Sequence, residues 1–194
     1  MRIGKSSRKT LETNVEAKIN IDGKGESNID TGIGFLDHML TIFSKHSLMD
    51  IDLSSKGDLD VDFHHSVEDV GIVLGSAFNK ALDDKKGIKR YGDTHTPMDE
   101  SLALVVIDIS NRSNLIFNAE FTKDKVGDFD TELVKEFFKA FSYNSFVTLH
   151  INLLQGGNAH HEIESIFKGF ARSIKVASSI SSEINGVMSS KDVL

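Results

Sequence analysis

Two copies of one short motif carry the residues of this chain that are best suited to chemistry. The segments His64–Glu68 and His160–Glu164 share the pattern His-His-x-x-Glu, ninety-six residues apart, and hold four of the eight histidines. Imidazole nitrogens and carboxylate oxygens at fixed spacing are typical of metal sites. A single copy would more often be a solvated histidine pair at a helix start, with the carboxylate favourable in the first turn. Two matched copies predict a metalloprotein.

The spacing within each motif limits how its ligands can be used. On a helix, residues three or four apart share a face, whereas neighbouring residues diverge by about 100°. Glu68 can therefore stand beside either His64 or His65, but the two imidazoles point apart. One small ion would rarely take both rings, so the pattern favours two ions that each take one histidine of a pair.

Composition limits both the class of protein and the class of metal. The chain has 194 residues, 39% of them hydrophobic and 26% charged, as in a soluble globular protein. It has no cysteine, so any metal is held by nitrogen and oxygen donors, which favours Mn, Fe, Zn or Ni. A net charge of −7 argues against a general nucleic-acid binder. Without a membrane-length apolar run or a signal-peptide core, we expect a cytoplasmic protein with no membrane partner.

An internal duplication positions the two motifs. Residues 35–44 align with residues 133–142 at an offset of 98, and both segments are predicted helices. An alternating strand follows each of them, over 49–53 and 147–151, and each motif then opens a second amphipathic helix. Further strands are predicted within 15–21, 101–109 and 115–121.

These elements predict an α+β fold built from two tandem, similar α/β-sandwich halves. The halves are residues 1–87 and 88–194, joined at the loop Asp83–Gly87 and forming one compact domain. Each half runs strands, helix, strand, helix, with the helices packed on one face of a sheet. We expect the two units to lie face to face, related by a pseudo-twofold axis.

The duplication also extends the predicted set of metal ligands. His38 lies in the first helix of the first half, and alignment makes Glu136 its equivalent in the second. Histidine and glutamate are both competent ligands for Mn or Zn. The candidate donors are then His38, His64, His65, Glu68, Glu136, His160, His161 and Glu164. Eight donors suit two ions with four protein ligands each, which leaves open positions for a substrate.

Four stretches of the chain together resemble one known family. They are Asp30–Leu40, His64–Asp69, Gly157–Glu164 and Ser189–Lys191. In this order they resemble imidazoleglycerol-phosphate dehydratase over essentially the whole chain. The resemblance implies an enzyme of histidine biosynthesis, a metal-dependent hydro-lyase with a ribosomal protein S5 domain 2-like fold in each half. It also implies two Mn²⁺ ions per active site and a homo-oligomer, an octahedral 24-mer with active sites between subunits.

The resemblance assigns the metal and substrate groups by position. The histidines and glutamates of both motifs, together with His38, match the family's metal ligands, whereas position 136 is His in some members and Glu here. Glu12 matches the family's substrate-contacting glutamate and is the candidate general acid/base. Glu68 and Glu164 complete the candidate catalytic set. The candidate phosphate ligands are Arg90, Arg112, Lys168, Ser189, Ser190 and Lys191. Asp192 stands where the family is expected to have glycine.

The implied reaction removes water from a phosphorylated imidazole, D-erythro-imidazoleglycerol phosphate, to give imidazole-acetol phosphate. Cations bound to the substrate's ring would favour its deprotonated form. The electron-rich ring could then expel the side-chain hydroxyl, after which a base removes the proton on the neighbouring carbon.

Two other classes remain compatible with the donor set alone. A binuclear metallohydrolase would use the metals to activate water against a phosphoester or an amide. A non-enzymatic assembly protein would use the motifs of different subunits only to hold a shell together. Outside the repeated motif, we interpret Asp99 and Glu100 as structural, and His46, His95 and His150 as packing or surface residues.

Overall fold

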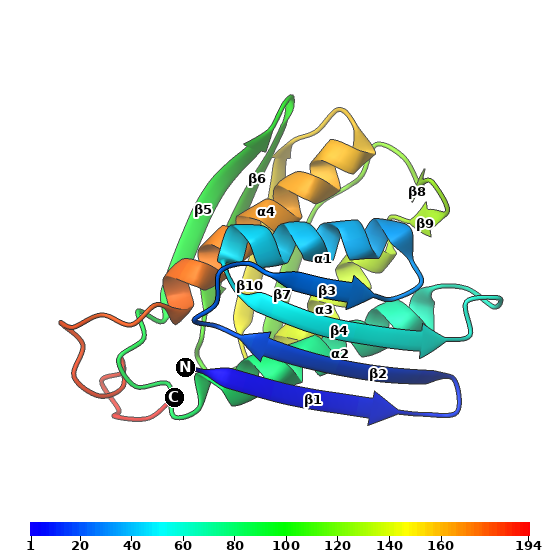
Figure 1. Ribbon diagram of the computed structural model, residues 1–194. Helices are drawn as coiled ribbons and strands as arrows, with labels where there is room; N and C mark the ends of the chain where they lie inside the picture. Colours follow the sequence, from blue (N-terminus) through cyan, green and yellow to red (C-terminus); the bar gives the residue numbers. More distant parts are fainter.

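Two four-stranded sheets enclose four helices in the structure, a computed structural model that describes residues 1–194 (Figure 1). The first half contains β1 (Ile3–Lys9), β2 (Thr13–Asn20), β3 (Ser27–Asp30), α1 (Gly34–Ser47), β4 (Asp50–Gly57) and α2 (His64–Leu82). The second half contains β5 (Tyr91–Met98), β6 (Ser101–Asp108), β7 (Asn114–Asn118), α3 (Leu133–Ser145), β10 (Thr148–Gln155) and α4 (Ala159–Ser178). A small ribbon of β8 (Lys125–Val126) and β9 (Phe129–Asp130) precedes α3.

The two sheets have the same topology. Their strand orders are β1-β2-β4-β3 and β5-β6-β10-β7. In each sheet the last pair, β4 with β3 and β10 with β7, is parallel, while the other pairs are antiparallel. The matching order confirms the predicted α+β fold of two similar halves. The boundary predicted between residues 87 and 88 lies in the connection from α2 to β5 and stays a prediction.

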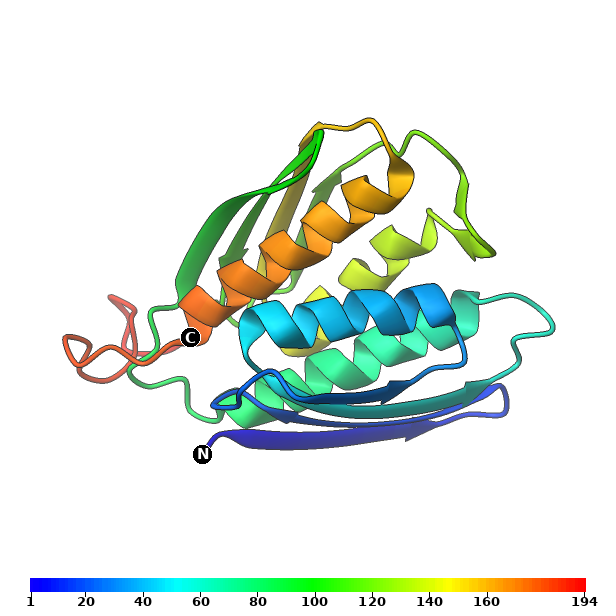
Figure 2. The same cartoon turned by 45° about the horizontal axis from the view of Figure 1, so that its top comes forward.

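The helices of both halves fill the space between the two sheets (Figure 2). In the first half α2 packs on β1 and β2, and in the second half α4 packs on β5 and β6. Across the middle, α1 lies against α4 and α2 lies against α3, so helices of different halves contact one another. None of the four helices combines the length and apolar composition that a membrane span requires.

One hydrophobic core of 41 buried residues runs through both halves. Alternate residues of β2 and β6 point into it, as strand geometry requires. Where α1 crosses α4, the rings of Phe43 and Phe170 stack with centroids 5.0 Å apart. Where α2 crosses α3, Gly71 and Gly75 let the helix approach the backbone of Phe137 and Phe141. These contacts fix the helices that carry both motifs.

Candidate metal centre and associated groups

Both His-His-x-x-Glu motifs begin a helix, as predicted, and each follows an Asx-type hydrogen bond. The Asp62 carboxylate accepts the backbone N–H of His64 at 2.8 Å, and the Asn158 side chain accepts that of His160 at 3.0 Å. Such bonds satisfy backbone donors that the first helical turn leaves without partners. The first turns of α2 and α4 are therefore held in place, and the histidines project from fixed positions.

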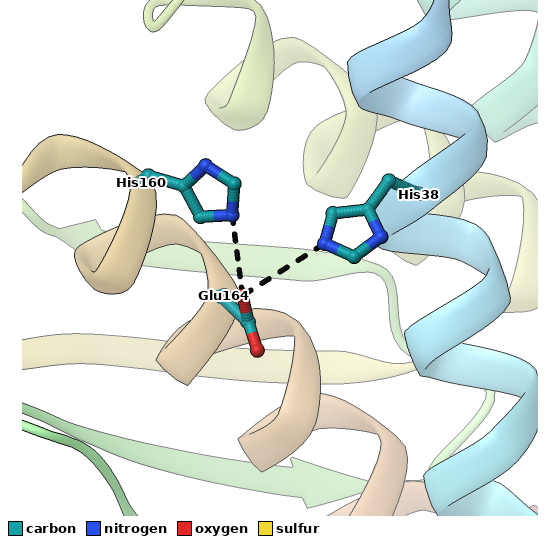
Figure 3. Close-up of side chains that lie close together, drawn as sticks. All are labelled: His38, His160 and Glu164. Carbon is teal, nitrogen blue, oxygen red and sulfur yellow. Dashed lines mark ion pairs between the residues drawn. The ribbon is translucent and has the colours of Figure 1, made fainter.

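The structure brings His38, His160 and Glu164 together in one cluster (Figure 3). Glu164 Oε2 lies 3.2 Å from His160 Nε2 and 3.9 Å from His38 Nε2. His160 and Glu164 are one turn apart on α4, whereas His38 comes from α1 in the other half. The side chains of His38 and His160 are half exposed, whereas that of Glu164 is only 11% exposed. The cluster, which we call the α1–α4 triad, opens to solvent through its imidazoles.

Lys168 orients the carboxylate of the α1–α4 triad. Its ammonium lies 2.6 Å from Glu164 Oε1, one turn further along α4. Burial alone would raise the pKa of Glu164, but the hydrogen bond and charge of Lys168 outweigh it, so this pKa lies below its ordinary value. Glu164 is therefore held as a carboxylate, with Oε1 on Lys168 and Oε2 turned toward the two histidines.

The donors of the α1–α4 triad fit a divalent cation. Their ligand atoms, two imidazole nitrogens and one carboxylate oxygen, lie within 4.8 Å of one another. Nitrogen and oxygen donors without thiolate suit Mn²⁺ and similar ions. Three protein donors also leave coordination positions for further ligands.

The second set of predicted ligands lies on α2 and α3, and its donor atoms do not converge within the chain as those of the α1–α4 triad do. His64 of α2 and Glu136 of α3 line the same surface hollow, together with Phe117, Phe121 and Lys135. Glu68, half buried, follows His64 by one turn, as Glu164 follows His160. The Glu136 carboxylate is paired with Lys139 at 3.3 Å. His64 and Glu136 thus border one hollow, and their pairing as metal ligands stays a prediction.

The second histidine of each motif points away from the first. The ring centroids are 6.3 Å apart for His64 and His65 and 6.2 Å apart for His160 and His161, and both pairs are near perpendicular. Each outward ring has a carboxylate at Nδ1: Asp58 lies 3.0 Å from His65, and Glu100 lies 3.1 Å from His161. Within one chain, neighbouring histidines therefore do not converge on one ion.

Glu12 lies at the tip of the β1–β2 hairpin, close to one motif. Its Oε2 is 3.7 Å from His65 Nδ1, and its side chain is largely exposed. The Thr10 hydroxyl accepts the backbone N–H groups of Glu12 and Thr13 at 3.1 and 2.9 Å. Thr13 in turn donates to Asp69 on α2. The hairpin that carries Glu12 is therefore fastened to the helix that carries the first motif.

The candidate phosphate ligands fall into two groups that are separate within the chain. Lys168 is paired with Glu164 of the α1–α4 triad, whereas Arg90, Arg112 and the tail 186–194 meet near the end of β6. Arg90 is buried. Its guanidinium donates two hydrogen bonds of 2.7 and 3.0 Å to Asp108 and a third, of 2.8 Å, to the Met188 carbonyl. Arg112 is 69% exposed and lies 3.7 Å from Asp108.

The tail itself is anchored while its polar side chains stay accessible. Ser189, Ser190 and Lys191 are not buried, and the chain end is held by a 2.7 Å hydrogen bond from Asn111 to the Leu194 carbonyl. Asp192 has a φ of 58°. That left-handed conformation favours glycine and admits aspartate at modest cost, which explains how Asp192 can stand at a position where glycine is expected.

Sequence reasoning did not identify the contacts that Asp58 and Glu100 make with His65 and His161. Glu100 was interpreted as structural, but it forms the closest contact of His161. The repeat contained a signal for it, because Glu100 directly precedes β6 as Glu12 directly precedes β2. The hydrogen bond with Asp58 raises the pKa of His65. Two hydrogen bonds lower the pKa of Glu100: the one with the larger effect comes from the backbone of Glu100 itself, and the other comes from His161.

Comparison with known proteins gives one consistent family. The sequence model of imidazoleglycerol-phosphate dehydratase matches residues 31–174. Proteins of that name from Clostridium kluyveri and Clostridioides difficile are 55% and 58% identical over 194 residues, covering 100% of both chains. The crystal structure of the Staphylococcus aureus dehydratase is similar with a TM-score of 0.84 at 46% identity, covering 92% of this chain and 99% of that one. The Pyrococcus furiosus enzyme has a TM-score of 0.84 at 36% identity, with 97% and 99% covered.

Proposed function

The chain belongs to the imidazoleglycerol-phosphate dehydratase family, and on this premise we propose that it converts D-erythro-imidazoleglycerol phosphate to imidazole-acetol phosphate with Mn²⁺. It is a dehydratase, a hydro-lyase of histidine biosynthesis. The observation that carries the proposed metal dependence is the α1–α4 triad, in which His38, His160 and Glu164 converge from two helices. The cytoplasmic location expected from the sequence remains part of the proposal.

Each part of the donor set has its own task in the proposed reaction. Bound Mn²⁺ would supply positive charge that favours the deprotonated form of the substrate's imidazole. His38 and His160 offer Nε2 as ligands, and Glu164 offers Oε2 because Lys168 holds Oε1. His64, Glu68 and Glu136 are the equivalent donors for the second ion. Two ions per active site, as the family resemblance implies, are part of this proposal.

Glu12 is the group proposed to move the proton. Its carboxylate is exposed at a hairpin tip, it is fastened through Thr10 and Thr13, and it lies near His65 rather than inside an ion pair with a lysine or arginine. A carboxylate that is positioned but not neutralised by a cation can accept a proton from a substrate carbon and return it elsewhere. We therefore assign the general acid/base role to Glu12.

The separation of these groups supports an active site shared between subunits. His65 and His161 point away from the donors beside them, so each is available to an ion held largely by another copy of the chain. Symmetric assembly would bring such surfaces together. The octahedral 24-mer implied by the family resemblance is part of this proposal, and Arg112, Ser189, Ser190 and Lys191 would then meet the substrate's phosphate from one of the contributing subunits.

Turnover is the direct test of the proposed function. Metal-free protein is incubated with imidazoleglycerol phosphate, with and without Mn²⁺, and a chelator is added to a third sample. We expect imidazole-acetol phosphate to form only in the sample with free Mn²⁺. A metal-loaded protein that forms no product would refute the proposal, and release of inorganic phosphate in its place would identify a metallohydrolase.

A further inference from the structure

His65 and His161, the second histidines of the two motifs, each have a carboxylate at the same ring nitrogen, Nδ1. Asp58 Oδ2 lies 3.0 Å from Nδ1 of His65, and the Glu100 oxygens lie 3.1 and 3.2 Å from Nδ1 of His161. A carboxylate at Nδ1 accepts the Nδ1–H proton, so in the neutral ring the remaining nitrogen, Nε2, keeps its lone pair. In this tautomer, Nε2 of both rings is ready to bind a metal.

The two carboxylates do not occupy equivalent places in the duplicated fold. Glu100 precedes β6 at the tip of the β5–β6 hairpin, which is the place that Glu12 occupies at the tip of the β1–β2 hairpin. Asp58 directly follows β4, and the residue that directly follows β10 is Gly156. The two halves therefore use carboxylates from different segments, Asp58 after β4 and Glu100 before β6, to bind Nδ1 of His65 and of His161.

The second half has no room for a counterpart of Asp58. A Cβ atom added to Gly156 would stand 2.4 Å from Oε1 of Glu162, far inside van der Waals contact. Glu162 is fully buried and accepts the backbone N–H groups of Gly157 and Thr122 at 2.7 and 3.0 Å, so it cannot easily move. The hairpin acid Glu100 instead makes the hydrogen bond with His161, and Asp99 of the same hairpin lies 4.0 Å from the same ring nitrogen.

The first half has both acids, and only one of them binds the histidine. Asp58 lies within hydrogen-bond distance of His65 Nδ1, whereas Glu12 stands at 3.7 Å. Asp58 Oδ1 is buried with no hydrogen-bond partner. The contact with His65 is made by the other carboxylate oxygen, Oδ2.

We propose that Asp58 and Glu100 are positioning residues that fix His65 and His161 as Nε2 metal ligands, and that Asp58 thereby leaves Glu12 free for the substrate. The inference rests on the proposed function, because the histidines are ligands only in a metal enzyme. Carboxylate partners of metal-bound histidines commonly orient the ring and strengthen it as a ligand. The equivalent hairpin acids of the two halves thus differ in their contacts: Glu100 holds the metal ligand His161, whereas Glu12 does not hold His65.

Mn²⁺ affinity of the full-length protein is the first test, because it can be measured without turnover. Free Mn²⁺ is followed by electron paramagnetic resonance during titration of wild type, Asp58→Ala and Glu100→Ala. We expect each substitution to weaken binding at the affected sites about 10- to 100-fold. Asp58→Asn and Glu100→Gln keep an oxygen that can accept the Nδ1–H proton, and we expect smaller losses from them.

Neighbouring acids provide matched controls for the loss of negative charge. Asp60 is exposed two residues from Asp58, and Asp99 is 71% exposed beside Glu100, 4.0 Å from His161. We expect Asp60→Asn to bind Mn²⁺ like wild type, and Asp99→Asn, whose carboxylate lies 4.0 Å from His161 Nδ1, to lose less affinity than Glu100→Ala. If the alanine variants fold with a native circular-dichroism spectrum and bind Mn²⁺ with wild-type affinity, the positioning role is wrong.

A double-mutant cycle separates positioning from general attraction of the cation. In a His65→Ala background, adding Asp58→Ala should cause no further loss of Mn²⁺ affinity, because the ring that Asp58 positions is gone. An additive loss would show that Asp58 acts on the metal independently of His65 and would overturn the inference. If wild type binds Mn²⁺ but forms no product, the proposed dehydration is wrong. The double-mutant cycle still tests the positioning role, because it measures Mn²⁺ affinity and not turnover.

A crystal structure can test whether Asp58 keeps the Glu12 carboxylate from binding His65. In a crystal structure of the Asp58→Ala variant, we expect the Glu12 carboxylate to move to hydrogen-bond distance of His65 Nδ1, as Glu100 stands to His161. If the Glu12 carboxylate stays where it is in the wild-type chain, Asp58 does not determine its freedom, and that part of the inference is wrong.

Discussion

Arg90 and Arg112 illustrate how two arginines with the same predicted role stand in different surroundings. Arg90 is buried, and its guanidinium binds Asp108 and the Met188 carbonyl, so it ties β5 and β6 to the tail. Arg112 lies beside the same aspartate with most of its side chain in solvent. The two residues are therefore expected to differ in what their loss does to the protein.

Substitution of Arg90 should damage the fold, whereas substitution of Arg112 should damage substrate binding. Arg90→Ala leaves Asp108 largely buried without its main partner, which costs on the order of 3 kcal/mol. Arg112→Ala should change stability by less than about 0.5 kcal/mol because its side chain is exposed, but should raise KM for the phosphorylated substrate. Urea midpoints at matched protein concentration and steady-state kinetics check both expectations. A stable Arg90→Ala protein would contradict the assignment of Arg90 to the fold.

Glu12→Gln should separate metal binding from proton transfer. The amide keeps the size of the side chain but cannot act as a base at neutral pH, so we expect kcat to fall by about 10²- to 10⁴-fold. Mn²⁺ affinity should stay unchanged, because Glu12 is not among the proposed metal ligands. Glu16→Gln, on an exposed position of β2, is the matched control and should behave like wild type. Equal loss in both variants would argue against a special role for Glu12.

At the scale of elements, the contact between α2 and α3 depends on the absence of side chains. A Cβ atom on Gly75 would stand 2.6 Å from the Phe141 carbonyl oxygen, so Gly75→Ala would push the helices apart. We expect it to lower the free energy of unfolding by about 1–3 kcal/mol despite the better helix propensity of alanine. Gly34→Ala, with nothing within 4 Å of the added atom, is the control and should not destabilise the protein. Thermal unfolding of both variants checks this.

The start of β4 gives the fold an acid-sensitive contact. The Asp50 carboxylate accepts the backbone N–H groups of Lys24 and Glu26 at 2.7 and 3.1 Å, closing the loop before β3. Burial alone would raise the pKa of Asp50, but these hydrogen bonds outweigh it and hold the pKa below its ordinary value of 3.8. The stabilisation is therefore complete above pH 3.8 and is lost as pH falls below that value.

Asp50→Asn should remove that pH dependence. An amide cannot titrate, so the variant should be less stable than wild type at neutral pH, and the difference should shrink as pH falls below 3.8. Urea unfolding of the metal-free protein, measured at neutral pH and near pH 3, checks this. A stability difference that grows toward low pH would contradict the assignment.

The elements that the sequence predicted are those with a strong hydrophobic period. The four helices and strands β2, β4, β6 and β10 are recognisable because alternate or helically spaced residues enter the core. The edge strand β1 has only Gly4 buried, and β5 contains Pro97, so neither pattern stands out. The strand expected over 115–121 ends at Asn118, where the chain leaves the sheet toward β8. Local pattern does not report where an edge strand stops pairing.

The candidate site, like the set of strands, could be predicted only in part from the sequence. The motifs and the alignment of His38 with Glu136 identify donors, but not which donors meet. His38 approaches His160 and Glu164 only because α1 packs on α4, which is a property of the three-dimensional fold. Asp58 lies in a short loop without a period, so its contact with His65 was visible only in the structure, whereas the position of Glu100 is marked by its equivalence to Glu12 in the repeat.

At the scale of the whole molecule, neither half is expected to fold alone. The core runs through both halves, and the inner faces of α1 and α2 are covered by α4 and α3. A separate 1–87 fragment would expose this apolar surface to water. We expect fragments 1–87 and 88–194 to aggregate or remain unfolded when expressed singly and to form a folded complex when expressed together. Circular dichroism and size-exclusion chromatography of the three preparations check this. Independent folding of either fragment would show two domains rather than one.

The α1–α4 triad takes His38 from one half and His160 with Glu164 from the other. A primitive chain of half this length could have completed such a triad only by meeting a second copy of itself, so its metal affinity would have depended on its own concentration. With both halves in one chain, the meeting of His38 with His160 and Glu164 is intramolecular and does not depend on protein concentration. Once the copies were no longer identical, one hairpin acid could keep holding a histidine while the other was released for the substrate.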